Sequence, residues 1–182
     1  MLKPRYDVSL FSDYDIFLFK KGSHLRLYER LGAHPFRSEE GTSGCCFAVW
    51  APNARAVSVI GDFNGWRAEA HPLAERWDGS GIWEVFIPGL GPGALYKYQI
   101  VSQEGEYRVQ KSDPFAFFCE TPPRTASVVR DLAYEWGDEG WLRERASRNG
   151  LAAPISIYEL HPGSWRRVPE QGMRPLNYRE LA

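Results

Sequence analysis

The chain has 182 residues, enough for one domain with a hydrophobic core and a smaller appendage. Its 22 basic and 23 acidic side chains give a net charge of −1, so charge gives no reason to expect a nucleic acid or a membrane as partner. Hydrophobic residues make up 43% and charged residues 25%, values that exclude a disordered chain. The chain begins without the apolar segment of a signal peptide and has no run of about 18 apolar residues. We therefore expect a soluble cytoplasmic protein.

The cysteines and histidines argue against metal and redox sites. Three cysteines are too few for a dense disulfide framework, and they lack the CxxC spacing of a zinc ribbon. The four histidines do not have the spacing of metal ligands either. We expect neither a metal nor a cofactor.

Residues 12–31 predict an interrupted helix at the start of the chain. Asp13 can cap its first turn, and Gly22 breaks the apolar pattern. Residues 31–35 predict the helix end, because Gly32 stands just past the last apolar position and Pro35 follows closely.

From Cys45 the hydrophobic pattern changes to the period of two that is typical of strands with one buried face. Turn-forming residues separate the segments with this pattern, which are 47–50, 57–59, 82–87, 95–101 and the shorter 107–111 and 127–130. Several short strands with turns between them predict a mostly β protein with an antiparallel β-sandwich.

The last fifty residues have a different character. Residues 131–150 predict a linker with a short charged helix, and residues 155–160 predict an apolar strand. Residues 178–182 predict the start of a helix. A strand, a loop and a helix start predict the first unit of a β/α array whose remainder is absent.

The segment 61–66, Gly-Asp-Phe-Asn-Gly-Trp, is the most informative motif. Asn-Gly favours a tight turn with positive φ angles, which can hold the Trp66 ring at the surface. A flat indole suits the apolar face of a sugar ring, while its N–H can reach a hydroxyl. Lys97, on the strand face opposite two tyrosines, could donate to sugar hydroxyls, and Tyr107 could be a second platform. Spacing alone favours a core tryptophan, a solvated lysine and a strand-packing tyrosine over these binding roles.

Signatures of catalysis are lacking. Glycoside chemistry needs two carboxylates a few ångströms apart, and no pair of acidic residues stands in a setting that suggests it. No nucleophile motif is present. No residue is predicted to be catalytic.

Ordered motifs from residue 24 to residue 182 resemble the amino-terminal part of 1,4-α-glucan (glycogen) branching enzymes. These motifs are YERLGAHP (28–35), FAVWAPNA (47–54), GDFNGW (61–66), GIWEVFIPG (81–89), LYKY (95–98), KSDPFAF (111–117), PISIYE (154–159), GSWRR (163–167) and YRELA (178–182). The resemblance implies an immunoglobulin-like carbohydrate-binding module of family 48, followed by the truncated start of a (β/α)₈ barrel. It divides the chain into a helical segment (1–35), the module (36–130), a linker (131–153) and the barrel start (154–182).

The resemblance also implies a partner and roles for three residues. The partner is α-glucan, as glycogen or maltooligosaccharides, on which Trp66 stacks and to which Lys97 donates hydrogen bonds. Tyr107 aligns loosely with a second aromatic contact. The family performs retaining transglycosylation with carboxylates that belong to later barrel strands, so its chemistry lies beyond Ala182 and the module contacts the missing barrel. Pro162 departs from the family, which has leucine there.

Three alternatives remain at this point. The chain could come from a debranching or trehalose-releasing relative, which shares the module and the barrel. It could be a stand-alone glucan-binding module, or a sandwich that only braces the barrel. In each case we expect residues after about 150 to be disordered, docked on the sandwich or prone to association, because their apolar strand has no partner.

Overall fold

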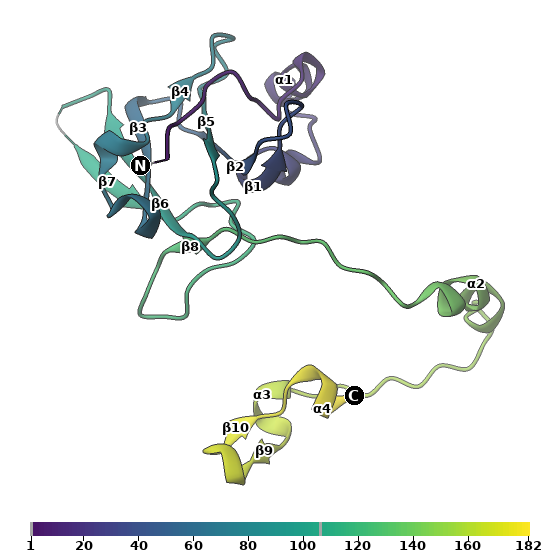
Figure 1. The fold of residues 1–182 in the computed structure, drawn as a ribbon. Coiled ribbons are helices and arrows are strands. Elements are labelled where there is room, and N and C mark those ends of the chain that lie inside the picture. Colours follow the sequence, from purple (N-terminus) through teal and green to yellow (C-terminus); the bar gives the residue numbers. More distant parts are fainter. Residues whose placement is uncertain (1, 106) are drawn as a thin grey trace. The chain divides into compact units, whose positions relative to one another are not determined.

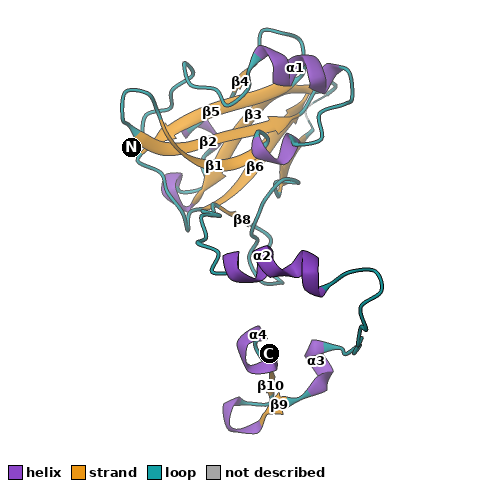
Figure 2. Cartoon of the chain, turned by 90° about the vertical axis from the view of Figure 1, so that its right-hand side faces the viewer, coloured by secondary structure: helices purple, strands orange, loops and turns teal. Residues whose placement is uncertain are grey.

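The computed structural model describes residues 2–105 and 107–182. They form two compact units, one up to Ala133 and the other Tyr134–Ala182. The first unit contains two antiparallel sheets (Figures 1 and 2). The strands of the first sheet, in spatial order, are β1 (Gly32–Arg37), β2 (Ser43–Trp50), β5 (Ile82–Pro88) and β4 (Ala74–Glu75). The strands of the second are β3 (Ala54–Gly61), β6 (Leu95–Ser102) and β7 (Arg108–Lys111), with β8 (Ser127–Val128) also paired to β6. The predicted mostly β, immunoglobulin-like sandwich is confirmed.

The core lies between the two sheets and follows the predicted alternation. From the first sheet Phe47 and Val85 are buried in it, and from the second sheet Val59, Tyr96 and Tyr98. Removing each of these side chains from water stabilises the fold by about 1.5–3 kcal/mol. Lys97, between the two tyrosines of β6, therefore lies on the outer face of the second sheet.

The helix predicted near the start of the chain forms, but its cap is Ser12 and not Asp13. Helix α1 (Asp13–Lys20) begins after Ser12, whose hydroxyl accepts the Asp15 N–H while the Asp15 carboxylate accepts the Ser12 N–H. This reciprocal pair satisfies two helix donors, which a cap at Asp13 could not do. A short 3₁₀ helix, η1 (Leu27–Glu29), follows the break at Gly22.

The helix end predicted over residues 31–35 is wrong, because Gly32–Arg37 forms strand β1. Gly32 has a φ of +108° and turns the chain into a strand that pairs with β2, with Ala33 opposite Phe47. Pro35 is tolerated because β1 is at the edge of the sheet, where a missing N–H leaves no partner unpaired.

The second unit consists of short elements. They are α2 (Glu139–Arg148), α3 (Pro162–Trp165), β9 (Arg167–Val168), η4 (Pro169–Gln171), β10 (Arg174–Pro175) and α4 (Tyr178–Leu181). The charged helix and the helix start at Tyr178 are confirmed. The strand predicted over 155–160 is wrong: this segment pairs with no other part of the described chain, and Ile155 and Ile157 are both 83% exposed. A β-strand requires a neighbour to accept its hydrogen bonds.

None of the helices in the described ranges is long and apolar enough to cross a membrane.

Strand β3 ends where its backbone passes very close to β6, and this contact requires glycine. A Cβ at Gly61 would lie 2.1 Å from the Leu95 carbonyl oxygen and 2.4 Å from the Phe63 ring. We expect Gly61→Ala to lower the free energy of unfolding by about 2–3 kcal/mol in chemical denaturation, because a backbone atom cannot move aside as a flexible side chain can. Gly91→Ala is the matched control, because nothing lies within 4 Å of its Cβ position. Equal stability of the two variants would contradict the close approach.

Candidate functional site

The turn after β3 presents Trp66. It consists of the 3₁₀ helix η2 (Asp62–Asn64), followed by Gly65 and Trp66 in the left-handed region with φ angles of 63° and 60°. The sequence predicted positive φ angles at Asn64 and Gly65, whereas the structure has them one residue later, at Gly65 and Trp66. Asn64 closes the 3₁₀ turn, and its side chain points into the fold. A second 3₁₀ helix, η3 (Ala68–Ala70), leads to β4.

The buried side chain of Asn64 holds this turn in place. Its Oδ1 accepts the Gly61 N–H (3.0 Å), and its Nδ2 donates to the Val59 carbonyl (3.0 Å) and to Nδ1 of His71 (2.9 Å). His71 is itself fully buried and donates from Nε2 to the Leu2 carbonyl at 2.8 Å. These partners require a neutral imidazole with its proton on Nε2. Burial lowers the pKa of His71 below its ordinary value, which favours this form.

Trp66 lies at the surface in an unusual backbone conformation. The residue is 39% exposed, and its backbone N–H donates to the Gly61 carbonyl at 2.9 Å. A bulky residue with a left-handed backbone costs about 1–3 kcal/mol, and such strain persists where the surroundings fix it, often at binding sites. The structure therefore excludes the alternative that Trp66 is a core residue.

Lys97 lies beside the same turn. The register of β3 and β6 places Ile60 opposite Lys97 and Gly61 opposite Tyr96. The Asp62 carboxylate accepts the Leu95 N–H at 3.2 Å and thereby ties the turn to the start of β6. Trp66 and Lys97 therefore belong to one end of the second sheet.

Tyr107 is not brought to this end of the sheet. Its carbonyl accepts the Ser102 N–H at 3.0 Å, so it lies at the opposite end of β6. Ser102 is six positions beyond Tyr96, which corresponds to about 20 Å along the strand. The residue is 63% exposed, so its ring is accessible from solvent.

Sequence reasoning missed Thr125. Its hydroxyl accepts from Nζ of Lys97 at 2.7 Å, so it holds the ammonium group over the outer face of the sheet. The two residues are far apart in sequence, and no local pattern predicts the contact. On the same face, β6 and β7 place Gln99 opposite Gln110, adding amide groups beside Lys97.

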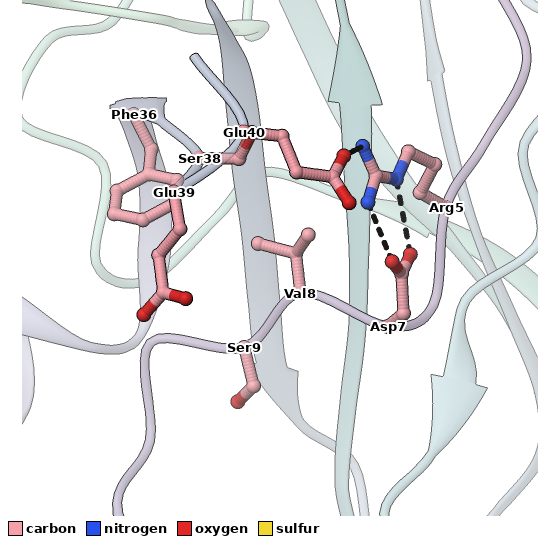
Figure 3. Close-up of a pocket in the computed structure, with 8 residues that line it drawn as sticks. All are labelled: Arg5, Asp7, Val8, Ser9, Phe36, Ser38, Glu39 and Glu40. Carbon is pink, nitrogen blue, oxygen red and sulfur yellow. Dashed lines mark hydrogen bonds and ion pairs between the residues drawn. The ribbon is translucent and has the colours of Figure 1, made fainter. Parts of the chain in front are cut away.

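A pocket of about 250 Å³ lies between the amino-terminal segment and the loop after β1 (Figure 3). Its cation, Arg5, donates to Asp7 and to Glu40 (Oε2, 3.0 Å), so it is already paired with carboxylates. The described part of the chain also contains no group of three histidine, cysteine or acidic residues that could hold a metal ion. The pocket therefore offers no separate anion or metal site.

Comparison with known proteins identifies the family. Residues 30–116 match the model of carbohydrate-binding module 48 (isoamylase N-terminal domain). The chain is 56% identical to the 1,4-α-glucan branching enzyme GlgB of Aquifex aeolicus over 96% of its own length and 27% of that protein. It is 53% identical to GlgB of Paramagnetospirillum magneticum over 93% of its length and 23% of that protein. The chain thus spans about a quarter of the length of these relatives.

Among solved structures, the chain is similar to Klebsiella pneumoniae pullulanase complexed with maltotriose, with 26% identity and a TM-score of 0.45. That match covers 56% of this chain and 9% of the pullulanase. The relatives at 53–56% identity are branching enzymes, so the debranching and trehalose-releasing alternatives are not favoured. Residues 30–116 belong to carbohydrate-binding module family 48, and the chain matches an amino-terminal fragment of a 1,4-α-glucan branching enzyme.

Proposed function

We propose that the sandwich is the glucan-binding part of a glycogen branching enzyme and that Trp66 and Lys97 contact the glucan. The observation that carries this proposal is the strained, partly exposed Trp66, held by buried Asn64 next to an outward-facing lysine. The indole offers an apolar plane for the C–H face of a glucose ring. The Lys97 ammonium and the Thr125 hydroxyl offer hydrogen bonds to sugar hydroxyls.

Tyr107 is proposed as a contact of its own. It lies about 20 Å along β6 from the Trp66 turn, so only an extended maltooligosaccharide could reach both rings. The outer face between them carries Gln99 and Gln110, whose amides can both donate and accept. A longer glucan should therefore gain more from Tyr107 than a short one.

We propose that the parent enzyme forms α-1,6 branches in α-1,4-glucan by retaining transglycosylation. The proposal assigns residues 36–130 to the module, 131–153 to a linker and 154–182 to the start of the catalytic barrel, which the module contacts. Exposed Ile155, Ile157 and Tyr158 support the last assignment, because an apolar segment of this kind requires neighbouring strands. No catalytic residue is assigned to this chain. Three free thiols support a reducing, cytoplasmic location.

Replacement of Trp66 tests the binding proposal. We expect Trp66→Ala to weaken binding of maltoheptaose at this site about tenfold, because the apolar plane is lost, while Trp66→Phe retains part of the affinity. Isothermal titration calorimetry measures the affinity, and thermal unfolding checks that the fold is intact. Trp141→Ala is the matched control, an exposed tryptophan of the second unit. If a folded Trp66→Ala protein bound maltoheptaose with unchanged affinity at every site, this turn would not bind sugar. The alternative that the sandwich only supports the barrel would then be favoured.

The buried His71 predicts a pH dependence of stability. The unfolded chain takes up a proton at His71 near the ordinary pKa of 6.5, whereas the folded chain does so only at lower pH. The unfolded state therefore binds more protons in this window, and stability falls as the pH falls below about 6.5. A protonated Nδ1 would also face the Asn64 donor.

We expect chemical denaturation between pH 7.5 and pH 5.5 to show a smaller loss of stability in His71→Gln than in the unchanged protein. The other histidines are present in both proteins, so the difference isolates His71. An identical pH dependence would mean that His71 does not need to stay neutral in the fold.

A further inference from the structure

A second aromatic groove lies on the other side of the sandwich, between helix α1 and the turn that joins β4 to β5. Its volume is about 330 Å³. It is lined by Asp13, Ile16, Phe17, Lys20, Trp77 and Asp78. None of these residues belongs to the Trp66 site.

Trp77 is 88% exposed, and a tight polar network fixes its turn. Arg76 donates from Nε to Asp78 (2.8 Å) and from Nη1 to Glu84 (2.6 Å), and the Ser80 N–H donates to Asp78 at 2.9 Å. The Arg76 and Asp78 side chains are only 8% exposed. The residues on both sides of Trp77 are thus locked while its ring is left in solvent. Such an exposed ring contributes little to folding.

The opposite wall is rigid as well. Helix α1 packs on the outer face of the first sheet through Ile16, which contacts the buried cluster of Ala48 and Ile82. Lys20 donates from Nζ to the Asp78 carbonyl, which joins the helix to the turn across the groove. The backbone of both walls is therefore held in place before any ligand arrives, which lowers the entropy cost of binding.

The lining combines flat apolar rings with hydrogen-bonding groups. The Trp77 indole and the half-exposed Phe17 ring offer apolar surface. The Asp13 carboxylate makes no hydrogen bond to the described residues and can accept from hydroxyls, and the Lys20 ammonium can donate to them. The Asp13 carboxylate disfavours a phosphate-bearing ligand. Neutral sugar rings, apolar on their faces and polar on their rims, fit this lining.

We propose that this groove binds a second segment of α-glucan, independently of Trp66. The proposal rests on the proposed function for the ligand class, but the residues are different. The groove belongs to the first sheet and α1, whereas Trp66 and Lys97 belong to the second sheet. The module would then hold two glucan chains, or two outer branches of one glycogen particle, and gain avidity for branched polymer.

NMR spectroscopy tests the proposal. The 182-residue chain is titrated with maltoheptaose, and the tryptophan indole N–H signals are followed. We expect the signals of Trp66 and Trp77 to shift with separate binding curves. Trp77→Ala should remove the second curve, with at least a tenfold loss of affinity at the groove, and leave the Trp66 curve unchanged. Trp77→Tyr should restore part of the binding. Because Trp77 is exposed, these variants should unfold at the temperature of the unchanged protein.

The outcomes separate the two proposals. If the Trp77 signal does not move with maltoheptaose while that of Trp66 does, the groove is not a glucan site and the proposed function stands. If Trp77 responds and Trp66 does not, the groove is supported and the Trp66 site fails. If cellohexaose shifts the Trp77 signal as strongly as maltoheptaose, the groove is not selective for α-glucan and the proposal is overturned. Trp141→Ala is the control that should alter neither curve.

Discussion

The buried amide of Asn64 is the interaction on which the candidate site depends. An amide buried without partners costs several kcal/mol, and here both ends of the Asn64 side chain are used by Gly61, Val59 and His71. His71 in turn donates a hydrogen bond to the Leu2 carbonyl, which connects the turn to the amino-terminal segment. The turn cannot relax without breaking several buried hydrogen bonds at once, so Trp66 keeps its left-handed backbone. The strain at the surface is thus maintained by polar contacts beneath it.

Strand β6 sets the geometry of the outer face. Its tyrosines are buried between the sheets, so the alternating residues, Lys97 and Gln99, are turned outward. The Trp66 turn is tied to the start of this strand and Tyr107 to its end. A ligand that uses the full face must therefore run along β6, over a row of amides. This arrangement suits a polymer better than a single sugar.

Much of this architecture could be predicted from sequence because alternation depends on burial of one face, which is a local pattern. The six segments of period two overlap β2, β3, β5, β6, β7 and β8, although the segment 127–130 is a strand only over Ser127–Val128. Errors arose where local signals have two meanings. Gly32 and Pro35 end many helices, but here they open an edge strand, since pairing with Ala48 and Cys45 of β2 outweighs the local signal. Thr125 escaped prediction because only the folded chain brings it to Lys97.

The strand predicted over residues 155–160 shows what a hydrophobic pattern leaves open. The pattern reports which side chains should be buried, but a strand exists only when another backbone accepts and donates its hydrogen bonds. Strand β1 forms despite Pro35 because β2 lies beside it with six residues in register. Ile155 and Ile157 have the better strand sequence but no paired neighbour in the described chain, so their backbone stays without a ladder. Pairing, more than intrinsic preference, decides which of these apolar segments becomes a strand.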